Sequence, residues 1–234
     1  KTIMGRPKMR AALQGKAPGL SAEKVLWNQG HEVVVGLDEV GKGAWAGPLT
    51  IGAVVVNQKK RITGVRDSKM LTEKEREVLF DRITNWATAW SVGHASNDEC
   101  DELGMSEAQR LAARRALAEL RLKPNRALLD GNWDFVGGGI AQTIVKGDTT
   151  SLSIASASVI AKVTRDRLLR EASDEWPEYS FSSNKGYPCP RHREALSNLG
   201  ATKFHRRSWS FMENASSGGE PRRFRSSPQI RLFN

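Results

Sequence analysis

A β-branched run that ends in two adjacent acids is the feature that most constrains how this chain folds. Residues 33–40 begin with three valines and predict a buried strand. Asp38 and Glu39 lie near its end, and after Val40 the glycine-rich turn GKGAWAGP begins. Adjacent carboxylates repel each other and are costly where a strand packs against a core. A bound divalent cation offsets that cost, so we expect a metal site at the end of this strand.

The same segment nearly matches a phosphate-binding loop. Residues 36–43 fit the pattern G-x-x-x-x-G-K-S/T except at the last position, where Gly43 has no hydroxyl to place on Mg²⁺. Asp38 and Glu39 would also put negative charge into a loop that holds phosphate with backbone N–H groups. The third glycine of a dinucleotide-binding turn is missing as well. Both nucleotide-binding interpretations are therefore disfavoured.

The net charge of +10 is concentrated at the two ends of the 234-residue chain. Residues 1–30 carry six Lys/Arg against one acid, and residues 213–234 carry four Arg against two Glu. The Ser-, Gly-, Pro- and Arg-rich segment 213–228 has little to bury and predicts disorder. Basic ends favour a polyanion such as nucleic acid, or they only aid solubility, and composition alone does not decide between the two.

The cysteine count and the hydropathy pattern narrow the class of protein. Cys100 and Cys189 lack the paired spacing of a zinc site and form no disulfide framework, so we expect a reduced, cytoplasmic compartment. No apolar run reaches membrane-spanning length, and the first residues lack the apolar core of a signal peptide. The hydrophobic content of 39% is enough for one sizeable core.

Strand and helix patterns alternate after the first strands, which predicts an α/β fold with a mixed sheet. Thr72 and Glu75 have capping-box spacing at a helix start, Pro124 and Pro177 end helices, and Gly200 closes the last helix. The predicted strands are residues 33–40, 50–57, 90–95, 127–130 and 142–145, and the predicted helices are 72–88, 105–122, 151–176 and 190–200.

Two further acids, Asp130 and Asp148, lie at or just after predicted strand ends. Each alone is typical of a turn residue. Together with Asp38 and Glu39 they provide four carboxylates, enough to hold two Mg²⁺ or Mn²⁺ ions roughly 4 Å apart for phosphodiester cleavage. Neighbouring residues of a regular strand point to opposite faces. Asp38 and Glu39 therefore share a site only if the strand ends, twists or bulges there, which the following glycines permit.

Six blocks along the chain resemble ribonuclease HII, the bacterial type 2 ribonuclease H. They run in the family's order and lie within residues 31–212. The blocks are LDEVGKGAWAGP (37–48), DSKMLT (67–72), LLDGN (128–132), VKGDTTSLSIASASVIAKVTRDR (145–167), NKGYPCPRH (184–192) and ATKFHRRSW (201–209). The resemblance implies a ribonuclease H-like α/β fold, with a mixed central sheet flanked by helices and a small C-terminal helical segment. The four metal-binding acids of the family fall on Asp38, Glu39, Asp130 and Asp148.

The resemblance also implies the reaction. Family members cleave the RNA strand of RNA–DNA hybrids and single ribonucleotides embedded in duplex DNA. They cut 5′ of the ribonucleotide with two Mg²⁺ or Mn²⁺ ions and leave 3′-OH and 5′-phosphate ends. We accordingly expect a cytoplasmic monomer whose partners are nucleic acids, with no membrane association. The expected organisation is a basic extension (1–30), a catalytic domain (31–212) and a basic tail (213–234).

The family's Gly-Arg-Gly tripeptide, whose backbone reads the 2′-OH, is here Gly41-Lys42-Gly43. Tyr187 resembles the residue that stacks on the following deoxyribose. Lys69 and Lys146 are candidates for phosphate contacts, as are Lys185, His192, His205, Arg206 and Arg207. Asp166 lies more than four helical turns beyond Asp148, so we expect it to pair with a neighbouring arginine rather than bind metal.

Two rival functions stay open from the sequence. One is a different carboxylate-cluster nuclease or DNA-processing enzyme with the same fold, which junction specificity would separate. The other is a non-catalytic module that binds hybrids. The full set of acids argues against the second rival, because a pure binder gains nothing from four carboxylates facing a polyanion.

Overall fold

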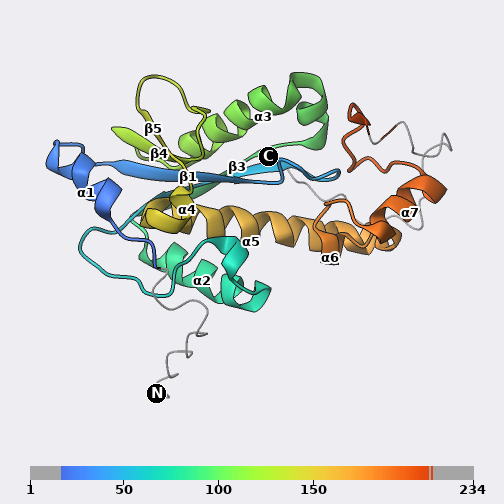
Figure 1. Ribbon diagram of the computed structural model, residues 1–234, viewed down its shortest axis with the longest axis horizontal. Coiled ribbons are helices and arrows are strands. Elements are labelled where there is room, and N and C mark those ends of the chain that lie inside the picture. Colours follow the sequence, from blue (N-terminus) through green and yellow to red (C-terminus); the bar gives the residue numbers. More distant parts are fainter. Residues whose placement is uncertain (1–16, 211, 213–234) are drawn as a thin grey trace, which may run out of the picture. The chain divides into compact units, whose positions relative to one another are not determined.

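The computed structural model describes residues 17–210 and 212 (Figure 1). The predicted tail 213–234 and the first 16 residues of the predicted extension lie outside the described residues. The chain divides into two compact units. Of the described residues, unit 1 contains 17–40, 50–94 and 109–164, and unit 2 contains 41–49, 95–108, 165–210 and 212.

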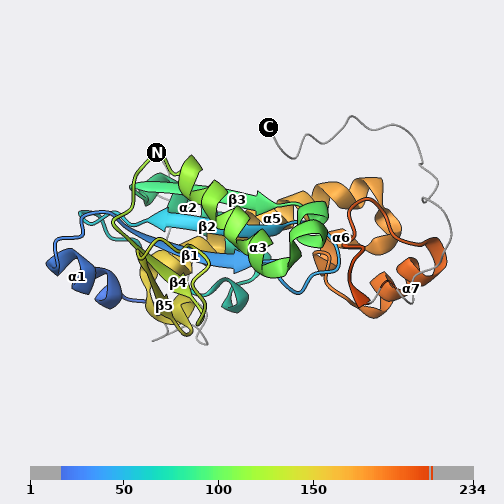
Figure 2. The ribbon, with the colours of Figure 1, turned by 90° about the horizontal axis from the view of Figure 1, so that it is seen from above.

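A five-stranded mixed sheet has the order β3-β2-β1-β4-β5 (Figure 2). β1 is antiparallel to β2 and parallel to β4, and β4 is parallel to β5. This confirms the predicted α/β fold with a mixed sheet, and each strand lies within two residues of its predicted bounds. The strands are β1 (Val34–Val40), β2 (Leu49–Val55), β3 (Ala89–Ala95), β4 (Arg126–Asp130) and β5 (Ala141–Ile144).

The four predicted helices form, and the described residues also contain three further α-helices and two 3₁₀ turns. The longer helices are α1 (Ser21–Asn28), α2 (Glu73–Trp86), α3 (Asn97–Glu119), α5 (Leu152–Glu175) and α7 (Pro190–Leu199). The shorter ones are α4 (Gly147–Thr150), α6 (Phe181–Asn184) and the 3₁₀ turns η2 (Ser68–Met70) and η3 (Pro177–Tyr179). The predicted capping box is confirmed, since the Thr72 side chain accepts from the Glu75 N–H and the Glu75 carboxylate accepts from the Thr72 N–H. None of the helices in the described part of the chain is long and apolar enough to cross a bilayer.

Helix α3 begins eight residues before its predicted start. Gly104 has φ 74 and ψ 161, so two helical pieces meet at a kink and the first piece takes in the acidic run at residues 98–102. The sequence pattern indicated only the second piece, because a glycine inside a helix reads as a boundary. Helices α1, α4 and α6 were not predicted either.

Small residues let helices approach the sheet of unit 1 closely. A Cβ at Gly52 of β2 would lie 2.4 Å from the Ala157 carbonyl oxygen of α5. A Cβ at Gly93 of β3 would lie 2.1 Å from the Ala112 carbonyl oxygen of α3. The small-residue helix that follows Ser151 therefore packs closely against the sheet. Figure 1 shows α3 and α5 covering opposite faces of the sheet.

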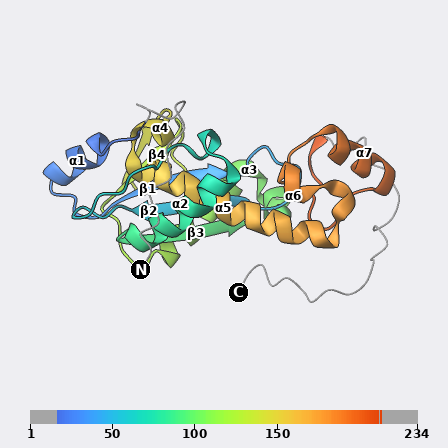
Figure 3. The same cartoon turned by 90° about the horizontal axis from the view of Figure 1, so that it is seen from below.

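A second layer of unit 1 lies outside α5. Leu79, Ile83 and Trp86 of α2 join Val159 and Val163 of α5 in one buried cluster. Figure 3 shows α2 lying over α5 from this side. The apolar face of α2 thus fixes α5 from outside, while the sheet glycines fix it from inside.

Unit 2 has its own core. Tyr179, Phe181, Leu196 and Phe204 are buried together with Leu169. The Tyr179 and Phe181 rings stack with centroids 5.6 Å apart. Helix α5 ends two residues before Pro177, and Gly200, with φ 81, follows α7, as the sequence predicted.

Candidate metal centre

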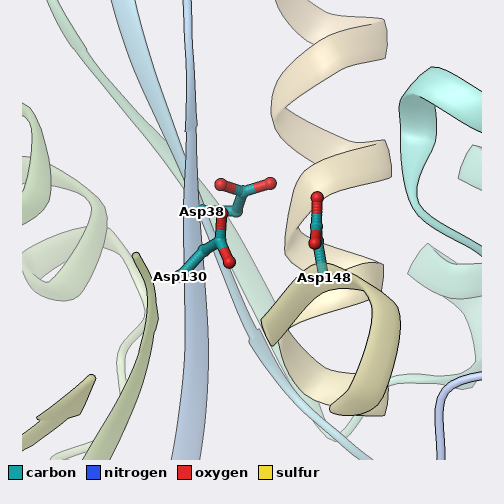
Figure 4. Close-up of side chains that lie close together, drawn as sticks. All are labelled: Asp38, Asp130 and Asp148. Atoms are coloured by element: carbon teal, nitrogen blue, oxygen red, sulfur yellow. The ribbon is translucent and has the colours of Figure 1, made fainter. Parts of the chain in front are cut away.

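Three aspartates from separate elements of unit 1 converge on one point. Asp38 lies on β1, Asp130 ends β4 and Asp148 lies on α4. One carboxylate oxygen from each lies within 4.8 Å of the others. Figure 4 shows the three side chains gathered together. The register explains the first pair, because Leu37 of β1 pairs with Leu129 of the parallel strand β4. Asp38 and Asp130 are therefore the next residues along two neighbouring strands.

Asp38 points to the sheet face that α5 covers. It pairs across the sheet with Gly52, one of the positions where α5 approaches the sheet closely, and it is only 4% exposed. Its Oδ1 accepts from the Glu39 N–H at 2.8 Å, and the Ser158 side chain of α5 also hydrogen-bonds to it. Burial raises the pKa of Asp38 well above its ordinary value, and the charges of Glu39 and Asp130 raise it further.

Asp130 joins β4 to the turn that carries Asp148. Its Oδ1 accepts from the Gly147 N–H at 2.7 Å. Lys146 precedes this glycine with φ 57 and ψ 40, a left-handed conformation that redirects the chain into α4. A Cβ at Gly147 would lie 2.5 Å from the Ile154 Cδ1, so a larger residue would have to displace the Ile154 side chain. Burial raises the pKa of Asp148 to about 6, and the charges of Asp130 and Asp67 add to the shift.

The donor set fits a hard divalent cation. Three carboxylates crowded at a largely buried point hold negative charge that raises the pKa of Asp38 and of Asp148. A cation among them would remove that penalty, and oxygen ligands suit Mg²⁺ or Mn²⁺. Lys69 gives partial compensation, with its Nζ 3.9 Å from the Asp148 Oδ2 and its side chain 78% exposed. Among the described residues, no histidine or cysteine joins the group.

Glu39 is not part of the three-aspartate group. The β1–β2 ladder continues regularly through Glu39 opposite Ile51 and Val40 opposite Thr50, so the strand does not end or bulge at the acids. Successive side chains alternate, and Glu39 leaves the strand on the face opposite to Asp38. Its role as a metal ligand stays a prediction. Asp166 is also outside the group and is buried within α5.

The glycine turn and Tyr187 meet within unit 2. The Gly41 N–H donates to the Tyr187 Oη at 3.2 Å, and the Ala44 N–H closes the turn onto the Gly41 carbonyl at 3.2 Å. Lys42 and Gly43 are exposed at its tip. The two features that the resemblance assigned to ribonucleotide recognition are therefore in direct contact.

Burial corrects part of the phosphate-contact prediction. His192, His205 and Arg206 are fully buried and Lys185 is 6% exposed, so their side chains are not presented to a substrate. Their polar atoms contact protein atoms instead, as with the Lys185 Nζ and the Ser182 carbonyl. Sequence alone does not show that a basic side chain is engaged by distant backbone. Lys69, Lys146 and Arg207 are exposed.

Sequence reasoning missed Glu23, a fully buried acid on α1. Its Oε1 accepts from the Ser151 Oγ at 2.6 Å and from the Ser153 N–H at 2.9 Å, at the start of α5. The contact spans 128 residues, and no local pattern indicates it. Glu23 therefore supports the junction between α5 and the helix that carries Asp148.

The ribonuclease HII family model matches residues 35–212. Ribonuclease HII of Streptomyces avermitilis is 44% identical over 185 residues, which is 79% of each chain, and that of Paracoccus denitrificans is 42% identical over 82% of this chain and 92% of its own. Among solved structures, ribonuclease H2 from Pyrococcus horikoshii has a TM-score of 0.66 and 31% identity over 77% of this chain and 95% of its own. With this sheet and these carboxylates, the matches confirm the resemblance: the chain belongs to the ribonuclease HII family and is a nuclease with a ribonuclease H fold.

Proposed function

We propose that this nuclease cleaves the RNA strand of RNA–DNA hybrids and duplex DNA at single embedded ribonucleotides, on the 5′ side of the ribonucleotide. The products are a 3′-OH and a 5′-phosphate. The convergence of Asp38, Asp130 and Asp148 within 4.8 Å is the observation that carries the proposal. These three acids, with Glu39 as the fourth ligand that the family resemblance alone implies, would hold two Mg²⁺ or Mn²⁺ ions. When bound, the ions activate the attacking water and stabilise the leaving 3′ oxygen.

The protein's own groups organise this chemistry. Asp130 holds the Gly147 N–H and so fixes the turn from which Asp148 projects. Lys69, exposed and 3.9 Å from the Asp148 carboxylate, is placed to meet a phosphate next to the acids. Lys146, directly before Gly147, is a second candidate for such a contact.

Ribonucleotide recognition is assigned to the turn Gly41-Lys42-Gly43 and to Tyr187. Backbone N–H groups of the turn would bind the 2′-OH, and the Tyr187 ring would stack on the next deoxyribose. The Gly41–Tyr187 hydrogen bond supports this assignment, because it makes the two elements one recognition unit. Lys42 keeps the charge of the family's arginine but lacks its planar fork.

The partners follow from the proposed reaction. RNA–DNA hybrids and ribonucleotide-containing DNA are polyanions, and the net charge of +10 with basic ends suits them. We place the protein in the cytoplasm as a monomer.

A cleavage assay tests the proposal. The substrate is duplex DNA with one ribonucleotide, incubated with Mg²⁺ or Mn²⁺, and the products are sized and their ends identified. Asp130→Asn keeps the Oδ1 that accepts from Gly147, so it should fold and yet lose at least ~100-fold in rate. The matched control is Asp134→Asn, because the Asp134 Oδ1 likewise accepts from the backbone N–H groups of Val136 and Gly137 but lies outside the acid group.

Each outcome decides between the proposal and a rival. Wild-type cleavage by Asp130→Asn would refute the role of the carboxylates. Binding of hybrids without any cleavage would favour the non-catalytic module. Cleavage of all-DNA duplex at a comparable rate would favour a general carboxylate nuclease. Tyr187→Ala should lose discrimination for the embedded ribonucleotide, and an unchanged preference would refute the role of Tyr187.

A further inference from the structure

Two fully buried arginines lie behind the recognition turn in unit 2. Arg165 and Arg206 are both 0% exposed. Burying a guanidinium is costly unless its N–H groups find acceptors. Here the acceptors are backbone carbonyls, and most of them belong to the segment 41–48 that begins with the recognition turn.

Arg206 binds the turn itself. Its Nη2 donates to the Gly41 carbonyl at 2.6 Å and to the Gly47 carbonyl at 3.2 Å. Its Nη1 donates to the Lys42 carbonyl at 3.0 Å. One planar guanidinium therefore holds the first two carbonyls of the turn together with the far end of the loop.

Arg165 binds the rest of the segment and Tyr187. It donates to the carbonyls of Pro48 (2.8 Å), Ala46 (2.8 Å) and Lys185 (2.7 Å). Its guanidinium carbon lies 5.6 Å from the centroid of the Tyr187 ring. Together the two arginines hold the loop and the tyrosine whose Oη accepts from the Gly41 N–H.

The planar peptide bond turns these contacts into a direction for two donors. In a trans peptide the C=O and the following N–H point in opposite directions. The Gly41 carbonyl shares its plane with the Lys42 N–H, and the Lys42 carbonyl shares its plane with the Gly43 N–H. Since both carbonyls point to the buried Arg206, both N–H groups point away from it, at residues that are exposed.

Glycine at position 41 is a requirement of the same arrangement. Gly41 has φ +92, and a Cβ there would lie 2.3 Å from the Arg165 Nε. The Gly41 backbone therefore packs so closely against the Arg165 side chain that no Cβ fits between them. Gly43, by contrast, has no positive φ, and its nearest neighbour to a Cβ is 4.0 Å away.

We propose that Arg206, backed by Arg165, is a positioning residue that aims the backbone N–H groups of Lys42 and Gly43 at the 2′-hydroxyl of the ribonucleotide. The inference rests on the proposed function, and it identifies Arg206 as the residue that orients the turn Gly41-Lys42-Gly43. It also explains how lysine replaces arginine at position 42, because the reading groups belong to the backbone.

The test compares Arg206→Met and Arg206→Lys with the wild type. The first measurement is kcat/KM on duplex DNA with one ribonucleotide, and the second is the affinity for the same duplex made wholly of DNA. We expect Arg206→Met to lower kcat/KM at least ~10-fold, because a small misplacement of binding groups costs that much. The affinity for all-DNA duplex should change less than about twofold, since it depends on phosphate contacts.

A matched control separates positioning from general stability. Tyr179→Phe removes a buried 2.6 Å hydrogen bond to the Gly200 carbonyl in the same unit but does not touch the turn. It should keep kcat/KM within about twofold of wild type, as expected for a bond remote from the binding groups. Arg206→Lys keeps the positive charge but lacks the planar guanidinium fork, so its kcat/KM should fall at least ~3-fold.

The outcomes are distinct from failure of the proposed function. A wild-type protein that does not cut the single ribonucleotide refutes that function. If the wild type cuts, a folded Arg206→Met with wild-type kcat/KM overturns the inference. An equal fall in kcat/KM and in all-DNA affinity also overturns it, because the effect would then be only structural. If Arg206→Met does not fold, Arg206→Lys decides, and wild-type kcat/KM in that variant overturns the inference.

Discussion

The Nε2 atoms of His192 and His205 lie 3.0 Å apart in the buried interior of unit 2. The Thr202 N–H donates to the His205 Nδ1 at 3.0 Å, so this nitrogen carries no proton. His205 therefore donates from Nε2 to His192. His192 in turn donates from Nδ1 to the Tyr187 carbonyl at 3.0 Å. The pair is neutral, and it forms one chain of hydrogen bonds from Thr202 to Tyr187.

Stability should consequently fall in mild acid. Burial lowers the pKa of His205 to about 3, with the neighbouring His192 adding to the shift, and burial also lowers the pKa of His192. The unfolded chain binds these protons below pH ~6.5 while the folded chain does not, so the contribution is complete above that pH and declines below it. His205 alone should account for about 1 kcal/mol between pH 6.5 and 5.5.

The measurement is denaturant unfolding from pH 8 to 5. The reference is the double variant His192→Gln/His205→Gln, which keeps polar groups but cannot titrate. Asp38 and Asp148 act in the opposite sense, because their raised pKa values favour the folded state as the pH falls. Comparison with the double variant cancels their effect. A constant difference between the two proteins over this range would contradict the prediction.

The fold was predictable where the signals are local. The capping box at Thr72, the helix stop at Pro177 and the glycine that ends α7 depend on neighbours in sequence, and all three are confirmed. Helix α1 has only a weak pattern of its own, since the Oε1 of its buried Glu23 accepts hydrogen bonds from residues 128 or more positions away. The first part of α3 was not predicted because Gly104 interrupts the helical pattern. The kink at Gly104 is fixed by the tertiary structure and not by the local sequence.

The acidic part of the site was predictable because its residues lie at strand ends, which meet at one edge of the sheet. Asp38 and Asp130 were brought together by parallel neighbouring strands, and Asp148 by the turn after β5. The buried basic residues were not predictable. The contact of Arg206 with Gly41 spans 165 residues, and nothing near Arg206 distinguishes it from the exposed Arg207.

Asp38→Asn should abolish the stabilising effect of divalent metal. The substitution removes the Asp38 carboxyl group, whose pKa is raised by burial and by nearby acids. The amide keeps an oxygen that can accept from the Glu39 N–H. The metal-free variant should therefore be more stable than the metal-free wild type near pH 7.5. Mg²⁺ should stabilise the wild type and have little effect on the variant, whose activity should fall at least ~100-fold. Unfolding in EDTA and in Mg²⁺ measures this, and equal Mg²⁺ stabilisation of both proteins would contradict it.

Gly43→Ala should separate recognition from folding. The structure leaves room for a Cβ at this position and requires no positive φ, so the free energy of unfolding should change by less than ~0.5 kcal/mol. A methyl group at the exposed tip would, however, stand between the backbone N–H groups and a ribose, and kcat/KM should fall at least ~10-fold. Gly41→Ala is the contrasting variant, because its positive φ and the 2.3 Å approach to Arg165 should destabilise the fold itself. Full activity of Gly43→Ala on the single-ribonucleotide duplex would remove Gly43 from the recognition turn.

Glu23 should affect the metal centre although it lies upstream of the family-matched residues 35–212. It is 0% exposed and holds Ser151 and Ser153, just after the helix that carries Asp148. Glu23→Ala leaves these donors without their acceptor and should lower the free energy of unfolding by about 1–3 kcal/mol. Glu23→Gln keeps an amide oxygen that can accept from these donors, so its free energy of unfolding should fall less.

The distinguishing readout is the Mg²⁺ concentration that gives half-maximal activity at a temperature where every variant is folded. It should rise in Glu23→Ala, because the turn that carries Asp148 loses its support, and rise less in Glu23→Gln. Glu32→Ala is the control, because it truncates an exposed acid between α1 and β1. Its Mg²⁺ dependence should match that of the wild type. A Glu23→Ala protein that is destabilised but has wild-type Mg²⁺ dependence would show that Glu23 supports the fold without positioning Asp148.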